Sequence, residues 1–255
     1  DFFKVSIVIS TLFFSCANNQ KDKSISFETP DGMVWVEGKS YTKGAKQNDD
    51  YAMMREKPSH EVYIDGFYID VTEVTNDQFQ KFVNETGYLT IAEREIDWEE
   101  MKKNLPAGTP KPHDSILQPG SLIFNDKLKK VDNMNNYFQW WRWQTGANWR
   151  SPKGPGSSIE NKGNFPVVHI AYEDAKAYCE WANRRLPTEA EWESAAQGNY
   201  KNAVFPWGDD LKLLNSNANT WQGKFRVNNE SIDGYEMIAP VKSFPANSIG
   251  IFDMV

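Results

Sequence analysis

The sequence predicts an α+β fold in which short helices and broken strands alternate with long irregular segments. Apolar and polar residues alternate over 32–45 and 61–70, and glycines interrupt both stretches, as expected for strands and turns. Two segments begin with the Ser/Thr-x-x-Glu/Gln pattern of a helix N-terminus, at Thr75 and at Thr188. Neither a helical nor a strand period lasts between 95 and 165, so this part is expected to be irregular.

The two strand stretches differ in what they predict. The first, "GMVWVEGKSYTKGA", has the pattern of a strand and a turn, and the second, "EVYIDGFYID", has that of two strands. In the second stretch Asp65-Gly66 occupies the position of a two-residue hairpin turn, and this dipeptide favours that geometry. We therefore expect the two halves of "EVYIDGFYID" to form a strand pair.

The helix that begins after Thr75 is expected to bury one face. Gln78 lies three residues after Thr75 and completes its capping box. Gly87 is a suitable residue for the C-terminal end. Three apolar residues at helical spacing form the expected buried stripe: Phe79, Phe82 and Val83.

Residues 165–198, "FPVVHIAYEDAKAYCEWANRRLPTEAEWESAAQG", predict a strand followed by two helices. One face of the first helix is expected to hold Ala175, Tyr178, Cys179, Ala182 and Leu186. This spacing directs Cys179 into the core. Pro187 is expected to end the first helix, and Thr188 with Glu191 to begin the second.

Composition narrows the classes of function. The chain has 255 residues, of which 40% are hydrophobic, enough to bury a sizeable core. Its formal net charge is −7 and it has no basic stripe, which argues against a nucleic-acid partner. Ten tryptophans and ten tyrosines are compatible with two interpretations: lining of a peptide or sugar cleft, and packing in a loop-rich core.

The first residues have the pattern of a bacterial export signal. Lys4 precedes an apolar run that is too short to cross a membrane and suits the core of a signal peptide. Ser15-Cys16 resembles a lipoprotein cleavage site, with Cys16 as the lipid-carrying residue; an ordinary signal peptide is the alternative. We predict a lipoprotein-like signal peptide over 1–16 and a polar tether over 17–27. This predicts a bacterial protein exported to the periplasm or cell envelope and held at the membrane by a lipid anchor.

Motifs for common catalytic chemistry do not occur in the sequence. His60, His113 and His169 have no metal-ligand spacing, and there is no H-E-x-x-H, C-x-x-C, G-x-S-x-G or phosphate loop. His169 is interpreted as a hydrogen-bonded core histidine at the end of a strand. Asn219 and Asp233 offer the oxygen ligands that calcium prefers, although turn formation is the default interpretation for both.

Several segments together resemble the formylglycine-generating enzyme, or sulfatase-modifying factor, family. They are, in chain order, "GMVWVEG", "HEVYIDGFYIDVTEVTNDQFQKFVNETGYLT", "GANWRSPKGPGSSI", the 165–198 stretch, "FPWGDD", "NANTWQGKF" and "DGYEMIAPVKSFPANSIGIFDMV". "RLPTEAEWE" and "PWGD" are typical of the wider superfamily, whereas "WW" followed by "GANWR" resembles the sulfatase-activating enzymes themselves. The resemblance implies one domain over 28–255. Its fold would be related to C-type lectin-like domains, with little regular structure and short helices around small antiparallel sheets.

The resemblance also implies an activity and its cofactor. Enzymes of this family oxidise a sulfatase cysteine in a Cys-x-Pro-x-Arg context to Cα-formylglycine with dioxygen, and two thiolates bind copper as Cu(I), a soft ion. This chain offers Cys16, in the leader, and Cys179, which matches a position that is structural or disulfide-bonded in some members. We therefore expect the catalytic cysteine pair beyond Val255, and a domain over 28–255 that is truncated at its C-terminus.

Single residues are carried over from the family in the same way. Calcium is implied at the side chains of Asn219 and Asp233 and at the main-chain oxygens of Thr220 and Tyr235. The residues that match substrate-peptide positions are Ala92, Asp97, Trp140, Trp149 and Arg150. For Trp149, packing is the alternative.

Two other functions are compatible with these features. A non-catalytic lipoprotein could use the same fold as a binding or structural module. An iron enzyme that forms carbon–sulfur bonds would need an additional helical domain with a histidine cluster, which the residues before Gly32 do not supply. The sequence beyond Val255 would discriminate among these functions, because a cysteine pair there is required for the copper chemistry.

Overall fold

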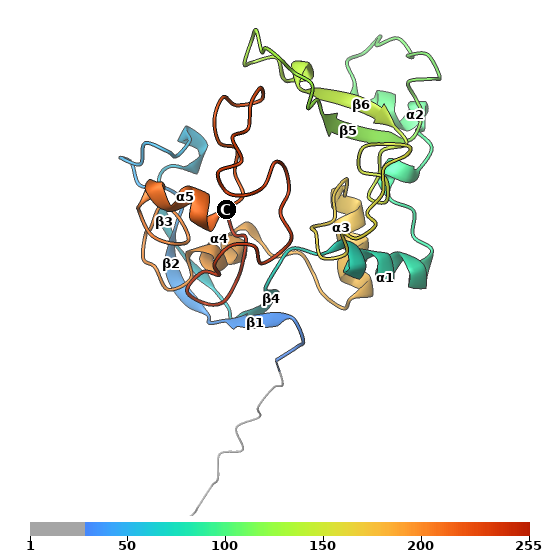
Figure 1. Ribbon diagram of the computed structural model, residues 1–255. Helices are drawn as coiled ribbons and strands as arrows, with labels where there is room; N and C mark the ends of the chain where they lie inside the picture. The colour runs from blue at the N-terminus through green and yellow to red at the C-terminus, as the bar shows by residue number, and fades with distance from the viewer. Residues whose placement is uncertain (1–28) are drawn as a thin grey trace, which may run out of the picture.

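A computed structural model of the protein describes residues 29–255; the predicted signal peptide, with Cys16, and the predicted tether lie outside the described residues. Short helices and two-stranded antiparallel sheets are linked by long irregular segments (Figure 1). The predicted fold class, α+β with little regular structure, is therefore confirmed. Over the described range, no helix combines the length and the apolar character that crossing a membrane requires.

The first four strands form one bent ribbon. Strand β1 (Met33–Val36) pairs with β4 (Phe67–Asp70), and β2 (Lys39–Lys43) pairs with β3 (His60–Ile64), both antiparallel. The predicted hairpin within residues 61–70 is wrong, because β3 and β4 do not pair with each other. They follow one another along the same side of the ribbon.

Two glycines explain the course of the ribbon. A Cβ atom on Gly38 would lie 2.8 Å from the backbone nitrogen of Gly66, and one on Gly66 would lie 2.2 Å from the ring of Trp35. Glycine in a strand often marks such a close approach of backbones. Asp65-Gly66 is thus a bend where the two sides of the ribbon approach closely while the pairing register continues. The dipeptide alone does not distinguish that bend from a hairpin turn.

Helix α1 (Asn76–Thr86) has the boundaries that its sequence predicts. The side chain of Thr75 accepts a hydrogen bond from the Gln78 amide, and the Gln78 side chain accepts one from the Thr75 amide. Gly87 ends the helix with φ of 68°, the left-handed conformation for which glycine is favoured. The predicted stripe is confirmed, because three of its side chains are buried: Phe79, Phe82 and Val83.

Helices α3 (Tyr172–Trp181) and α4 (Glu189–Gln197) confirm one prediction and correct another. Thr188 and Glu191 form the expected capping box at the start of α4. However, α3 ends at Trp181, well before Pro187. Asn183 has φ of 54°, which already takes the chain out of the helical conformation.

The segment expected to be irregular contains a strand pair. Strand β5 (Gly120–Phe124) pairs antiparallel with β6 (Trp141–Thr145), and the short helix α2 (Trp98–Met101) precedes them. Each strand has five residues, and the proline-, glycine- and asparagine-rich chain on either side of them gives no lasting period. The remaining elements are α5 (Leu214–Asn217) and five 3-10 turns: η1 (Met54–Glu56), η2 (Ile91–Glu93), η3 (Lys102–Asn104), η4 (Tyr137–Gln139) and η5 (Leu211–Leu213).

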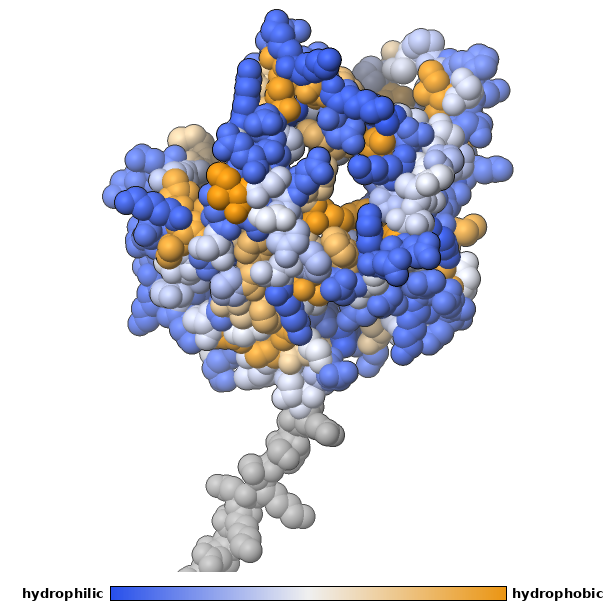
Figure 2. All heavy atoms as spheres, viewed as in Figure 1, coloured by the Kyte–Doolittle hydropathy of each residue, from blue (hydrophilic) through white to orange (hydrophobic). Residues whose placement is uncertain are grey.

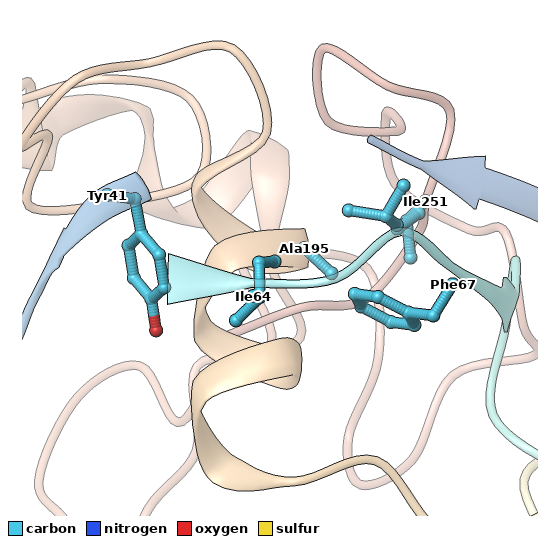
Figure 3. Close-up of a cluster of buried hydrophobic side chains, with 6 residues drawn as sticks. Tyr41, Ile64, Phe67, Ala195 and Ile251 are labelled. Atoms are coloured by element: carbon cyan, nitrogen blue, oxygen red, sulfur yellow. The ribbon is translucent and has the colours of Figure 1, made fainter. Parts of the chain in front are cut away.

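The apolar interior consists of two clusters. The first lies between the β1–β4 ribbon and α4 (Figure 3), and its buried residues are Val36, Tyr41, Ile64, Phe67, Ala195 and Ile251. The second lies between α1 and α3, and its buried residues are Phe79, Phe82, Val83, Trp149 and Tyr178. Cys179 packs against the second cluster, as its position on the predicted helix face indicated.

An ion pair holds the corner between α3 and α4. Arg185 donates to both carboxylate oxygens of Glu191, over 2.7 and 2.5 Å. These bonds from Arg185 lower the pKa of Glu191 to about 2; burial opposes this, and the Thr188 capping bonds assist it. The unfolded chain lacks these bonds and has the ordinary pKa of 4.5. The folded state therefore binds fewer protons between these two values, and its stability falls as the pH falls through this window.

We expect Glu191→Gln to lower the free energy of unfolding at pH 7 by about 1–2 kcal/mol, because a charge-assisted bidentate pair is lost. The difference from the wild type should shrink as the pH is lowered from about 4.5 to about 2. Urea unfolding at several pH values measures it. Glu189→Gln is the control, because it removes from the same turn a carboxylate that pairs with Lys43 and not with Arg185. Its side chain is exposed, so this loss should be the smaller one. A pH-independent difference would contradict this account.

Candidate functional site

Asp233 is one of the four predicted calcium residues, and the other three all contact its carboxylate. Its Oδ2 accepts hydrogen bonds from the side-chain amide of Asn219, at 2.9 Å, and from the backbone amide of Thr220, at 3.1 Å. Its Oδ1 accepts from the backbone amide of Tyr235, at 3.0 Å. The loop before Trp221 and the turn at Gly234 are thus joined through one side chain.

Gln222 belongs to the same cluster, although sequence reasoning did not find it. Its side chain is buried, donates to the carbonyl oxygen of Thr220 over 2.5 Å and accepts from the Asp233 amide over 3.3 Å. A glutamine after "NANTW" carries no signal of its own, because its role depends on a loop that returns eleven residues later.

The electrostatics keep Asp233 ionised. Burial acts to raise its pKa, but the bonds from Tyr235, Gln222, Asn219 and Thr220 outweigh burial and lower it. The four predicted ligands are all oxygens, the type that a hard cation such as Ca²⁺ prefers. The ligand types thus suit calcium. In the structure, however, N–H groups of Asn219, Thr220 and Tyr235 face the Asp233 carboxylate. A cation would need the Asn219 amide turned so that its oxygen faces the site, with water completing six to eight oxygens. Residues 29–255 hold no cluster of three or more Asp, Glu, His or Cys that would suit another metal.

The predicted substrate-peptide residues occupy the other half of the molecule, near β5 and β6. Ala92 is buried in η2, which packs against β5. Asp97 is the N-cap of α2, and its carboxylate accepts hydrogen bonds from the two amides that follow Trp98. Trp140 directly precedes β6 and is only 3% exposed. In Figure 2, an opening separates this half from the loops of the other half.

A buried carboxylate positions the segment that holds Ala92. Asp174 is fully buried, and its Oδ1 accepts hydrogen bonds from the Tyr88 hydroxyl and the Ile91 amide, both at 3.0 Å. Its Oδ2 accepts from the Ala171 amide, at 2.8 Å, which caps α3. The start of α3 and the beginning of η2 are therefore fixed to each other.

Arg150 and Trp149 have different surroundings, although they are adjacent. Arg150 forms an ion pair with Glu93 over 2.6 Å, which brings the "GANWR" segment next to η2. Trp149 is completely buried and packs edge-to-face on Phe79, with ring centroids 5.2 Å apart. Its side chain therefore has the packing position that the alternative predicted. A substrate-binding role stays a prediction for all five residues: Ala92, Asp97, Trp140, Trp149 and Arg150.

His169 joins β5 to the chain after "GANWR". Its Nδ1 lies 2.8 Å from the Ser121 hydroxyl and its Nε2 lies 2.8 Å from the Pro152 carbonyl oxygen. The interpretation as a hydrogen-bonded core histidine is confirmed. The strand expected before it is wrong, because this segment forms only an isolated bridge between Thr75 and Pro166, and His169 has φ of 60°.

Cys179 is the sole cysteine among residues 29–255, and it has no disulfide partner there. Burial raises the pKa of its thiol, Asp70 acts in the same direction, and Arg184 opposes them. A thiol of this kind is a poor thiolate ligand near neutral pH. The described residues therefore do not fit a Cu(I) site that requires two thiolates.

Comparison with known proteins identifies the class. The fold, with its short helices and two-stranded sheets, is shared with the solved structure of PvdO from Pseudomonas aeruginosa. The TM-score is 0.53 at 23% identity, over 87% of this chain and 66% of that chain. Residues 19–255 match the sulfatase-modifying factor enzyme 1-like domain. The chain therefore belongs to the sulfatase-modifying factor family.

Curated relatives include active and inactive proteins. The formylglycine-generating enzyme of Mus musculus is 44% identical over 201 residues, which cover 78% of this chain and 49% of the relative. The "Inactive C-alpha-formylglycine-generating enzyme 2" of the same species is 38% identical over 205 residues, covering 78% and 58%. This chain thus spans about half the length of the first relative.

We expect Asp174→Asn to lower the free energy of unfolding by about 1.5–3 kcal/mol, because one acceptor oxygen becomes an amide that faces an N–H donor. Urea unfolding followed by far-UV circular dichroism measures the loss. Glu173→Gln is the matched control, since it removes an exposed carboxylate from the same helical turn and should cost less than about 1 kcal/mol. Equal losses in the two variants would show that burial and hydrogen bonding of Asp174 do not matter.

Proposed function

We propose that the protein matures sulfatases by oxidising a cysteine of the sulfatase polypeptide, in a Cys-x-Pro-x-Arg context, to Cα-formylglycine. The observation that carries the proposal is the 44% identity to a formylglycine-generating enzyme over most of this chain. The arrangement of η2, Arg150 and β6 supports it, because these elements place the predicted peptide-binding residues in one half of the molecule.

The described residues would bind and orient the polypeptide. Asp174, the Glu93–Arg150 pair and the His169 bonds fix the backbone around Ala92 and β5, so that the surface is formed before a peptide binds. A preorganised surface lowers the entropic cost of binding. Conversion of the CH2–SH group to an aldehyde is a two-electron oxidation that breaks the C–S bond and releases the sulfur as sulfide. We propose dioxygen with copper as the oxidant, and an added thiol reductant as the source of the two further electrons that reduce the second oxygen atom to water. Since residues 29–255 offer no thiolate pair, no step of the oxidation is assigned to them.

The test is conversion of a peptide by the full-length protein. With copper, oxygen and a thiol reductant supplied, a Cys-x-Pro-x-Arg peptide should lose its thiol and gain an aldehyde, detected by mass spectrometry and by an aminooxy label. A peptide with serine in place of the cysteine is the control and should stay unlabelled. Absence of aldehyde in the cysteine peptide would refute the proposed oxidation.

A second function has support from a specific observation. The inactive mouse relative is also 38% identical to this chain, so the same fold exists without the activity. A full-length protein that binds the cysteine peptide but never converts it would be a non-catalytic binding module. The conversion experiment therefore separates the two functions, provided that peptide binding is measured alongside.

We also propose that one calcium ion binds at Asn219, Thr220, Asp233 and Tyr235. The contact between Asn219 and Asp233 and the lowered pKa of the Asp233 carboxyl support this proposal, together with the oxygen ligands that the family resemblance implies. Both connected segments have little regular structure, and ordering a residue costs roughly 1–2 kcal/mol of backbone entropy. A cation that binds only the folded state offsets part of this cost.

For wild-type protein, calcium at about 100 times its Kd should stabilise the folded state by about 2.7 kcal/mol, and a chelator should reverse this. Asp233→Ala should have a lower melting temperature and no response to the chelator, because the formal negative charge of the site is gone. Differential scanning calorimetry with and without chelator measures both. Asp49→Ala is the control: its carboxylate accepts a similar loop bond from the Tyr51 amide. Equal chelator responses in wild type and Asp233→Ala would place calcium elsewhere.

A further inference from the structure

The guanidinium of Arg226 lies against two aromatic rings. Its central carbon is 3.4 Å from the ring centroid of Trp140 and 4.1 Å from that of Phe225. The segment after α5 that carries Arg226 rises toward the connection between β5 and β6 (Figure 1). Trp221 on this segment also contacts Phe124 of β5, with ring centroids 5.6 Å apart. The two halves of the molecule therefore meet at an aromatic cluster with a cation in it.

The hydrogen-bonding capacity of Arg226 is almost unused. Its Nε is buried without an acceptor, and its Nη1 has only the Met134 sulfur at 3.6 Å, a weak acceptor. In the part of the chain that the structure describes, no carboxylate lies within ion-pair distance of Arg226. Four other arginines do have a carboxylate partner: Arg94, Arg150, Arg184 and Arg185.

A purely structural role explains this arrangement incompletely. Contact with aromatic faces attracts the cation, but it satisfies none of the N–H donors, and an arginine in a protein does not lose its charge. The backbone is also unfavourable, since Arg226 has φ of 73°, in the left-handed region that non-glycine residues rarely adopt. The rings of Trp140 and Phe225 hold the planar guanidinium group of Arg226 in one orientation. A guanidinium that is already oriented can bind both oxygens of a carboxylate at a lower entropic cost.

The surroundings match an acidic polypeptide. Two apolar neighbours of Arg226, Met134 and Phe225, are well exposed, and so are Tyr137 and Phe138 in the η4 turn that leads to Trp140. Lys224 is exposed on the same segment and has no ion-pair partner among residues 29–255. Two cations bordered by exposed aromatic rings complement a peptide that carries a carboxylate next to apolar residues.

We propose that Arg226 is a carboxylate receptor, which binds an acidic side chain of the polypeptide that lies beside Trp140. The inference rests on the proposed function, because it assumes that a polypeptide enters next to Trp140. It adds a preference that the sulfatase proposal does not contain: an aspartate or glutamate near the target cysteine. Trp140 and Phe225 act as positioning residues, since they orient the guanidinium and do not bind the carboxylate themselves.

The test compares matched peptides on the full-length protein. Labelled Cys-x-Pro-x-Arg peptides carry glutamate at each flanking position in turn, and their partners carry glutamine there. All peptides are amidated at the C-terminus, which removes the terminal carboxylate. Each glutamate peptide therefore differs from its glutamine partner by one carboxylate only. For one position, the glutamate peptide should bind wild-type protein about tenfold more tightly by fluorescence anisotropy, the size of a charge-assisted hydrogen bond. Glutamate and glutamine peptides should bind Arg226→Gln equally.

Control variants separate the receptor from general charge. Arg55→Gln removes an exposed arginine from η1 and should keep the tenfold preference. Arg226→Lys should retain only part of it, because the charge remains but the planar fork is lost. If Arg226→Gln does not fold, the glutamate preference of the wild-type protein and its partial loss in Arg226→Lys test the receptor instead. A peptide with a free C-terminus and glutamine throughout should not gain the preference, since the receptor is assigned to a side-chain carboxylate.

The outcomes distinguish this inference from the proposed function. If every peptide binds wild-type protein and glutamate gives no advantage at any position, the receptor is overturned while peptide recognition stands. If no peptide binds, peptide recognition fails and the receptor fails with it. If Arg55→Gln abolishes the preference as fully as Arg226→Gln, the effect is one of net charge and the receptor is again overturned.

Discussion

The buried carboxylate of Asp174 is the constraint on which the half of the molecule around α3, η2 and β5 depends. A charge without access to water must have its lone pairs satisfied, and here a hydroxyl and two backbone amides from three segments supply the donors. Each donor fixes the segment that carries it, so α3 and η2 adopt one relative position. Glu93 then extends this order to Arg150. The surface around Ala92 is therefore formed by electrostatics as much as by apolar packing.

Local features of the fold could be predicted from the sequence, and pairings between distant segments could not. The capping boxes at Thr75 and Thr188 are complete within four residues, so the sequence contains all of their partners. The strand pairing is different, because β1 pairs with β4 in a ribbon that bends at Gly38 and Gly66, and no single stretch of sequence reveals that pairing. Proximity along the chain favoured a hairpin, and the packing of the whole ribbon excluded it.

In the candidate site, too, some residues could be predicted from the local sequence and others depend on contacts between distant segments. Asn219 and Asp233 could be singled out because oxygen ligands in irregular backbone suggest calcium, and the structure brings them into contact. The predicted peptide-binding residues followed only from a family resemblance, since their types and spacing have no chemical signature. Arg226 and Gln222 were missed because their roles depend on which rings and carbonyls the folded chain places beside them. Burial of Trp149 likewise depends on helices that lie on either side of it in sequence.

The first apolar cluster has a consequence for the order of events during synthesis. Its members come from the β1–β4 ribbon, from α4 and from Ile251, and the bond between Lys39 and the Gly198 carbonyl spans 159 residues. Contacts this far apart form only after a large loop is closed, which slows folding. A growing chain would expose the apolar sides of its first strands until nearly all of these residues have been made. During that interval the apolar face of the ribbon, which α4 and Ile251 later cover, is open to association with other chains.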